Sequence, residues 1–139
     1  MLMAHPLHSS PLMEPFAIDV PQATLDDLRE RLARTRWPDS ALEGWDGGID
    51  PAYLRTLAEH WLVGFDWRAQ EAALNRFAQF RADVDGLGVH FIHERGRGER
   101  PFPLILSHGY PDSFGRYVKV IPLLTHPESH GGDGADAFD

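Results

Sequence analysis

The stretch that decides the fold is Leu104-Ile105-Leu106-Ser107-His108-Gly109-Tyr110-Pro111, an apolar run that passes directly into a turn. A short buried strand followed by His-Gly-aromatic-Pro predicts a turn whose backbone N–H groups can face a developing oxyanion. Such a turn assists a reaction only when a nucleophile, a base and an orienting acid lie beside it. Candidates for those groups must therefore be sought in the rest of the chain.

Composition limits the partners of this 139-residue chain, a length that suits one domain or a region packed onto part of another. The hydrophobic share of 42% and the charged share of 24% are enough for a core, so global disorder is not expected. A net charge of -8 with only 13 Lys and Arg argues against nucleic-acid binding. The absence of cysteine excludes disulfides and a Cys nucleophile, and it fits a reducing cytoplasm.

The first 14 residues lack Lys and Arg and contain no long apolar stretch, so they do not resemble a signal peptide. They predict a flexible leader. No window approaches the roughly 18 apolar residues of a membrane span. We expect a cytoplasmic chain that binds neither membrane nor nucleic acid.

The first half of the chain predicts one strand and then helices. Residues 16–20 alternate apolar with small or polar residues, which predicts a short edge strand stopped by Pro21. Apolar residues at helical spacing then follow in three segments, with capping residues at their starts. These segments run from Thr24 to Trp37-Pro38, from Asp50-Pro51 to Gly64, and from Asp66 through Phe77. The tryptophans Trp37, Trp61 and Trp67 are interpreted as packing residues.

The second half returns to strand periodicity. Residues 80–84 and 89–93 alternate around Asp85-Gly86, which predicts a hairpin. The 104–107 strand and its turn come next, followed by a helix over 114–121 in which Pro122 predicts a kink or a tightened end. From His126 onward Gly and Asp dominate, and a flexible acidic tail is expected.

Five segments, taken in order, carry a family resemblance. They are Arg34–Asp39, Gly64–Glu71, Leu74–Phe77 with Phe80, the hairpin ending in His90-Phe91-Ile92-His93, and His108-Gly109-Tyr110-Pro111. Together they resemble the epoxide hydrolase family of microsomal type, over residues 15 to about 130. The order of the segments, and the Phe-Asp-Trp-Arg run within the second, make the resemblance more specific than His-Gly-x-Pro alone.

The resemblance implies an α/β fold, in which an N-terminal helical region packs on the opening strands of an incomplete α/β-hydrolase sheet. The expected boundaries are a leader over 1–14, the epoxide hydrolase N-terminal region over 15–79, the start of the hydrolase core over 80–125, and a tail over 126–139. The implied substrate is a small hydrophobic epoxide, in a detoxification role.

The implied chemistry is hydrolysis of an epoxide to a vicinal diol. In the family an aspartate attacks an epoxide carbon to give an ester, a His–acid pair activates water, and two lid tyrosines polarise the epoxide oxygen. The resemblance assigns the Tyr110 backbone N–H to the oxyanion hole, with His108, Gly109 and Pro111 shaping the turn. It also implies a cis peptide bond before Pro111, because only X–Pro bonds adopt cis cheaply. No cofactor and no metal are expected.

Two departures from the family pattern bear on that turn. Tyr110 stands where the family usually has Trp, and this exchange retains an aromatic ring at the position. Asp112 stands where the family usually has Gly. Its carboxylate either caps the helix that begins at Ser113 or places negative charge beside a developing anion.

The family's nucleophile, second acid, His and lid tyrosines match nothing in this chain. The acids of the Gly-rich tail, Asp133, Asp136 and Asp139, lie in no strand–turn–helix and are not interpreted as nucleophiles. We therefore expect a C-terminally truncated form that is inactive alone. The alternatives are a binding module that docks on a separate C-terminal hydrolase portion, or a non-functional remnant.

Other polar residues are interpreted as structural. His108 shapes the turn rather than transferring protons. His90 and His93 are three apart on a strand and point to opposite faces, and His126 and His130 lack zinc-helix spacing, so neither pair predicts a metal site. The open edge of the 104–107 strand predicts self-association of the isolated chain.

Overall fold

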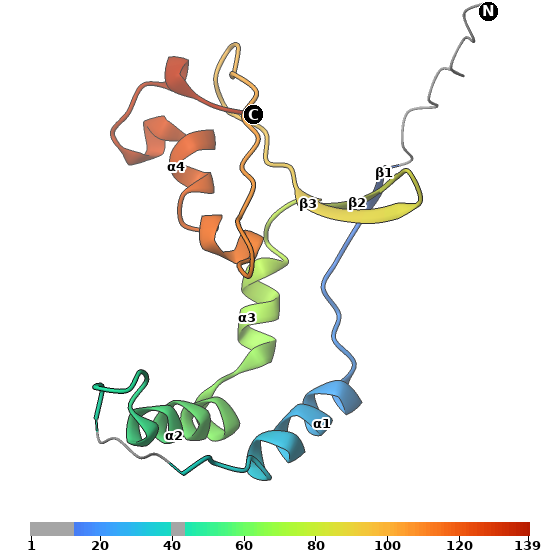
Figure 1. Ribbon diagram of the computed structural model, residues 1–139. Helices are drawn as coiled ribbons and strands as arrows, with labels where there is room; N and C mark the ends of the chain where they lie inside the picture. The colour runs from blue at the N-terminus through green and yellow to red at the C-terminus, as the bar shows by residue number, and fades with distance from the viewer. Residues whose placement is uncertain (1–12, 40–43) are drawn as a thin grey trace, which may run out of the picture. The chain divides into compact units, whose positions relative to one another are not determined.

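The computed structural model describes residues 13–39 and 44–139 (Figure 1). They form two compact units. One unit comprises Asp19–Glu71, and the other joins Ala72–Asp139 to the residues that end at Ile18. The residues predicted as a leader lie outside the described part, except that Met13 and Glu14 belong to a strand.

The Asp19–Glu71 unit is helical. It contains α1 (Gln22–Ala33), α2 (Pro51–Glu59), a π-helical turn over His60–Gly64 and most of α3 (Trp67–Leu74). The predicted start of α2 is confirmed, because the Asp50 carboxylate accepts a 2.7 Å hydrogen bond from the Ala52 N–H and Pro51 follows at the first turn.

The predicted bounds of α1 are wrong at both ends. The N–H groups of Thr24 and Leu25 donate to the Pro21 carbonyl, so the first turn already begins before Thr24. The helix ends at Ala33, ahead of Trp37-Pro38. A residue that precedes proline disfavours helical backbone, and here the helix stops several residues before that position.

The leucine face of α1 packs within its own unit. Leu25 is buried, and a small hollow is lined by two of the three predicted packing tryptophans, Trp61 and Trp67. The hollow is lined by Leu25, Leu28, Leu32, Trp61, Phe65, Trp67 and the stem of Arg29. Trp37 instead carries the Arg55 guanidinium over its ring, 5.0 Å from the centroid.

Glu71 closes the helical unit with three hydrogen bonds. Its carboxylate accepts from the Val20 N–H at 2.8 Å, from the Trp67 indole N–H at 3.1 Å and from Arg68 at 2.6 Å. The Val20 N–H, followed by the Arg68 guanidinium, lowers the pKa of Glu71 below its ordinary value of 4.5.

A carboxyl group whose pKa is lowered in the folded state stabilises the fold at pH values above its ordinary pKa. This stabilisation is lost as the pH falls through the pKa of the folded state. We expect Glu71→Gln to melt at a lower temperature than the wild type at pH 7. The difference between the two melting temperatures should become smaller below pH 4.5. Thermal melts at several pH values check this, with the exposed Glu99→Gln as the control. If the melting temperature of Glu71→Gln stays below that of the wild type by the same amount from pH 7 to acid, the ionised Glu71 carboxylate is not the stabilising group.

The other unit contains a three-stranded antiparallel sheet in the order β1 (Met13–Pro15), β2 (Gln79–Val84), β3 (Leu87–Ile92). The predicted hairpin is confirmed. Its two turn residues, Asp85 and Gly86, have φ of 53° and 84°, the left-handed conformation that Asp and Gly tolerate best. β3 lies at an edge of this sheet (Figure 1).

The first strand lies earlier than the sequence predicts. β1 covers residues 13–15, and the predicted 16–20 stretch continues its pairing only through the Phe16 N–H, which donates to the Gln79 carbonyl at 2.8 Å. Beyond it, the Asn75 side chain hydrogen-bonds both the N–H and the carbonyl of Ile18, each at 2.8 Å. A side-chain amide thus replaces the strand partner that the alternating pattern suggested.

The strand predicted over 104–107 is not paired as a strand. Pairing occurs just before it, where a parallel bridge joins Phe102 to Phe138. The predicted 114–121 helix is a 3-10 helix over Phe114–Tyr117, followed by α4 (Ile121–Thr125) with Pro122 in its first turn. The break ahead of Pro122 agrees with the expected kink.

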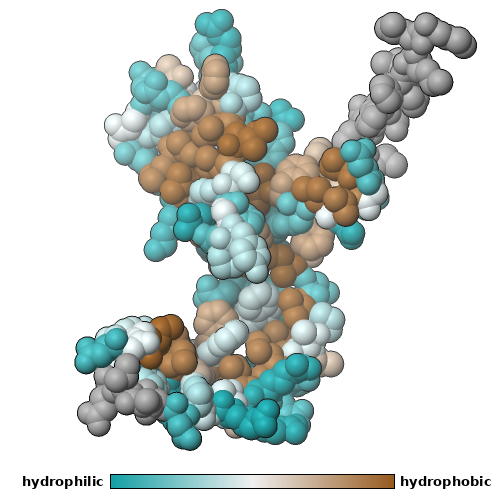
Figure 2. Space-filling model, in the orientation of Figure 1, coloured by the Kyte–Doolittle hydropathy of each residue, from teal (hydrophilic) through white to brown (hydrophobic). Residues whose placement is uncertain are grey.

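The segment predicted as a flexible tail has defined structure. It forms 3-10 helices over Pro127–His130 and Gly134–Asp136, and then returns to the 102–104 segment. Ala137, at 1% exposed, is one of three buried apolar residues in the described chain, with Leu25 and Ala82. Large apolar side chains remain exposed instead, and Figure 2 shows them gathered over the α4 region of this unit.

Candidate functional site

The turn at residues 108–111 has the backbone that the sequence predicts. The Tyr110–Pro111 peptide bond is cis. The Asp112 N–H donates to the Gly109 carbonyl at 2.8 Å and closes the turn. His108 places its Nδ1 atom 3.2 Å from the Gly109 carbonyl oxygen, within the turn itself.

The turn leaves a backbone donor free for a ligand. In the described part of the chain, the Tyr110 N–H donates to no protein acceptor. The Tyr110 side chain is fully exposed, and nothing lies within 4 Å of the position that a Cβ on Gly109 would take. The space beside the donor is therefore open, as an oxyanion site requires.

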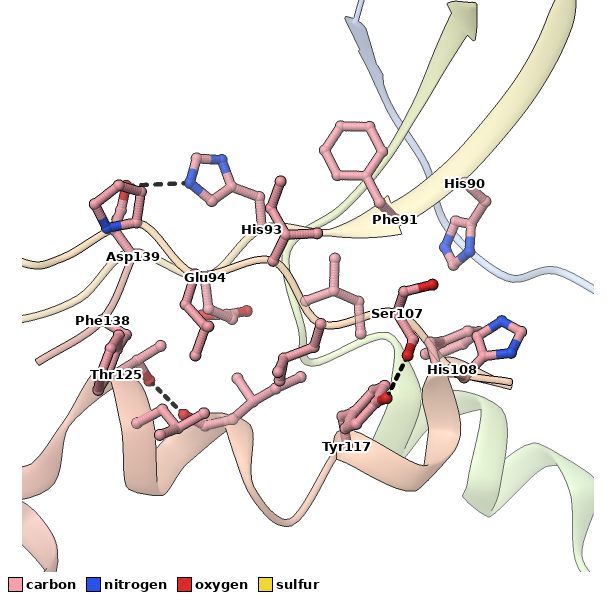
Figure 3. Close-up of a pocket in the computed structure, with 18 of the residues that line it drawn as sticks. His90, Phe91, His93, Glu94, Ser107, His108, Tyr117, Thr125, Phe138 and Asp139 are labelled. Carbon is pink, nitrogen blue, oxygen red and sulfur yellow. Dashed lines mark hydrogen bonds and ion pairs between the residues drawn. The ribbon is translucent and has the colours of Figure 1, made fainter. Parts of the chain in front are cut away.

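Four contacts either join the turn to the helix that follows it or cap that helix. The Tyr117 hydroxyl donates to the Ser107 carbonyl at 2.8 Å (Figure 3). The Ser113 hydroxyl accepts from the Gly115 N–H at 3.3 Å and caps the 3-10 helix. Asp112 accepts from the Ser113 N–H at 2.8 Å and forms an ion pair with Arg116.

These contacts decide between the two interpretations of Asp112. The helix cap is Ser113, so Asp112 is not the capping residue. Its negative charge is balanced by Arg116 one turn along, a partner that the sequence analysis missed. The charge beside the open donor is therefore partly neutralised.

An apolar groove of about 760 Å³ adjoins the turn (Figure 3). One side is formed by β3 and the residues just after it, and the other by residues 103–108. Side chains of the following helices complete the lining, namely Phe114, Tyr117, Ile121, Leu124 and Thr125, together with Phe138 and Asp139.

A carboxylate lies at the end of the groove remote from the turn. Asp139 accepts from the Gly96 N–H at 3.1 Å and lies 3.3 Å from the His93 Nε2 atom. The His93 contact, and then the Gly96 N–H, lower the pKa of Asp139. Figure 3 shows Asp139 and His93 together at this end, and His90 with Ser107 and His108 at the other.

His90 connects β3 to the helix that follows the turn. Its ring lies between Phe16 and Phe114, with centroid distances of 4.8 and 5.0 Å. Its Nε2 atom lies 2.9 Å from the Gln79 side-chain oxygen, and burial lowers the pKa of the ring, which favours neutral imidazole. His90 and His93 thus have separate partners, and the described residues contain no group of three His, Cys, Asp or Glu that could hold a metal ion.

The structure also places the tail acids. Asp133 caps the last 3-10 helix by accepting from the Ala135 N–H at 2.9 Å, and only Asp139 reaches the groove. Sequence reasoning missed the contacts of Tyr117 and Asp139. Tyr117 lies in the predicted 114–121 helix, and that pattern does not indicate a hydrogen bond to Ser107. Nothing in a Gly-rich tail signals that its last residue returns to the sheet.

Comparison with known proteins identifies the family. The family model "Epoxide hydrolase N terminus" matches residues 13–117. The chain therefore belongs to the epoxide hydrolase family and corresponds to the N-terminal region of that family. The chain is 49% identical over 125 residues to "Putative epoxide hydrolase" of Stigmatella aurantiaca and 36% identical over 132 residues to "Epoxide hydrolase 1" of Oryctolagus cuniculus.

The solved structures agree with an incomplete α/β-hydrolase fold. The Aspergillus niger epoxide hydrolase superposes with a TM-score of 0.73 at 34% identity, over 84% of this chain and 31% of that chain. The two sequence matches include 89% and 91% of this chain. They correspond to only 28% of the length of the Stigmatella relative and 29% of the length of the rabbit relative. No helix among the described residues is long and apolar enough to cross a membrane.

Proposed function

We propose that this chain supplies the oxyanion-binding turn of an epoxide hydrolase, with the Tyr110 backbone N–H as the donor. The observation that carries the proposal is the free Tyr110 N–H on a closed turn beside an apolar groove. A small hydrophobic epoxide suits that groove, because its lining offers mainly aliphatic and aromatic surface.

The donor acts in the second half of the proposed reaction. An aspartate supplied from outside this chain opens the epoxide ring and forms an alkyl ester. Water then attacks the ester carbonyl, whose oxygen gains negative charge and accepts a hydrogen bond from the Tyr110 N–H. Collapse of this intermediate releases the diol and restores the carboxylate. The turn therefore accelerates breakdown of the ester rather than its formation.

The 139-residue chain by itself is proposed to be inactive. The carboxylates of the turn and of the groove lining are already engaged, Asp112 by Arg116, Asp139 by His93 and Gly96, and Glu94 by the Ala78 N–H. None of the three is placed as a free nucleophile.

We expect the purified chain to leave styrene oxide unhydrolysed. A chimera in which this chain replaces the matching region of the Stigmatella relative should form the diol. Diol production measured by chromatography checks both. Turnover by the chain alone would contradict its proposed inactivity, whereas an inactive but folded chimera would contradict the proposed function.

A second candidate function is an interaction module that docks on a separately supplied C-terminal hydrolase portion. The exposed apolar surface of the sheet unit favours it. Ile105 is 93% exposed, and Leu104 and Leu106 on either side of it are also exposed. Surface of this kind in a protein is commonly covered by a partner.

The same exposed surface predicts self-association of the isolated chain. We expect the weight-average mass to rise with concentration, and Ile105→Lys to shift the equilibrium toward monomer, because a charge on this edge opposes pairing. Sedimentation equilibrium checks this. The matched control is Val63→Lys, at a 78% exposed site in the helical unit. Equal effects of the two substitutions would argue against association through residues 104–106.

A further inference from the structure

An ion pair begins two residues after the free Tyr110 N–H. Its acid is Asp112, whose own N–H closes the turn onto the Gly109 carbonyl at 2.8 Å. Its base is Arg116, one turn further along. Among the described residues, Arg116 is the only cation that forms an ion pair with the Asp112 carboxylate. Whether the negative charge of Asp112 is balanced therefore depends on Arg116.

Both oxygen atoms of the Asp112 carboxylate have partners in the residues that follow it. The Oδ1 atom accepts a 2.8 Å hydrogen bond from the Ser113 N–H, and the Oδ2 atom contacts the Nε atom of Arg116. The bond from the Ser113 N–H fixes the carboxylate but leaves its charge in place, because an amide carries no net charge. Only the Arg116 guanidinium cancels that charge.

Stability does not explain this ion pair. The side chains of Arg116 and Asp112 are 58% and 33% exposed, and ion pairs with this exposure add little to the free energy of unfolding. The field at a neighbouring site is a separate effect. An unbalanced carboxylate raises the free energy of an anion that forms nearby, and a cation paired with the carboxylate opposes that increase.

We propose that Arg116 is a positioning residue of the oxyanion site and acts through Asp112, whose charge it balances while the ester is hydrolysed. The proposal rests on the proposed function of the Tyr110 N–H. In this step water adds to the ester carbonyl carbon and loses a proton to a base outside this chain, and the carbonyl oxygen becomes an anion. Collapse re-forms the carbonyl and breaks its bond to the diol oxygen, which takes up a proton. Arg116 thus assists hydrolysis of the ester and not its formation.

Single-turnover kinetics of the Stigmatella chimera test this role, because they separate formation of the ester from its hydrolysis. Arg116→Gln should slow hydrolysis of the styrene oxide ester about ten-fold, since the Asp112 charge is then unbalanced near the developing anion. Formation of the ester should change little. Added salt should reduce the defect, because both side chains are partly exposed to screening ions. Arg116→Lys keeps the positive charge and should retain most of the rate.

Rescue distinguishes an electrostatic role from a structural one. Asp112→Asn keeps an acceptor for the Ser113 N–H and removes the charge that Arg116 balances. Combined with Arg116→Gln, it should restore hydrolysis of the ester to within about three-fold of the wild type, because the two effects are coupled. If the ion pair only held the turn together, the double variant would be as slow as Arg116→Gln. That result would overturn the proposal, as would equal slowing by Arg100→Gln, the control at an exposed arginine.

A second measurement uses the 139-residue chain and requires no turnover. The probe is phenylphosphonate, an anion with an apolar ring, and its affinity is measured from the NMR shift of the Tyr110 N–H. Arg116→Gln should weaken this affinity at least about three-fold, and the double variant with Asp112→Asn should regain it. Equal affinities of the wild type and Arg116→Gln would overturn the proposal. A Tyr110 N–H that does not respond to the probe would also overturn it, because Arg116 would then have no anion site to serve.

The two measurements separate this proposal from the proposed function. If a folded chimera is inactive but the variants bind phenylphosphonate in the expected order, the proposed function is wrong and the charge balance by Arg116 is supported. If Tyr110→Pro slows hydrolysis of the ester and Arg116→Gln does not, the backbone donor is supported and the role of Arg116 is wrong.

Discussion

Tyr110→Pro in the Stigmatella chimera should lower kcat for styrene oxide by about 10²–10³-fold, the usual cost of removing one oxyanion-hole donor. Proline lacks the N–H, so the substitution deletes the proposed donor itself. The side chain is fully exposed and contributes no packing. Steady-state kinetics of the purified chimera provide the measurement.

The control is Tyr110→Trp, which keeps the N–H and introduces the aromatic residue that the family pattern favours. It should retain kcat within a few-fold, because catalysis depends on the backbone donor. Equal losses in the two variants would assign the effect to the side chain. Full activity of Tyr110→Pro in a folded chimera would contradict the proposed role of the turn.

Gly96→Ala should destabilise the sheet unit by about 1–3 kcal/mol, the usual cost of overpacking a filled site. A Cβ on Gly96 would lie against the Phe138 carbonyl oxygen and 2.6 Å from the Pro101 Cβ. Backbone cannot yield as a side-chain tip does, so the 137–139 segment must move off residues 102–104. Urea unfolding of the 139-residue chain measures the change.

Gly134→Ala is the matched control, because Gly134 lies in the C-terminal segment that a Cβ on Gly96 would contact. Nothing lies within 4 Å of the position its Cβ would occupy. Its unfolding midpoint should stay close to that of the wild type. A destabilisation shared by both variants would mean that this segment is sensitive to any added methyl group, and that the contact of Gly96 with Phe138 is not decisive.

The features that the sequence predicted correctly are those fixed by neighbouring residues. Asp85-Gly86 supplies the conformation of a tight hairpin without help from distant parts of the chain. Asp50-Pro51 begins α2 in the same way, through a cap two residues away. The cis bond before Pro111 also belongs to a local motif.

The features that it missed depend on partners far along the chain. The first strand stops at residue 15 and gives way to a loop because Asn75, 57 residues beyond Ile18, takes both backbone groups of Ile18. The 104–107 run has strand composition, but a strand requires a partner, and the described chain pairs only its beginning. Composition cannot show whether such a partner is present.

The candidate site divides in the same way. The turn could be recognised from four consecutive residues, and the Ser113 cap lies just beyond it. Tyr117 lies in the predicted 114–121 helix, but its hydroxyl bond to Ser107 depends on how the helix returns across the preceding segment. Asp139 lies in a sequence that suggests a flexible tail, yet it contacts His93, 46 residues earlier.

The most direct test of the oxyanion assignment is intact-mass spectrometry of the Tyr110→Pro chimera, quenched during turnover of excess styrene oxide. If the Tyr110 N–H serves breakdown of the ester, the main species should carry one covalently bound substrate, because formation of the ester continues while its hydrolysis is slowed. A slow variant that remains entirely unmodified during turnover would contradict the account.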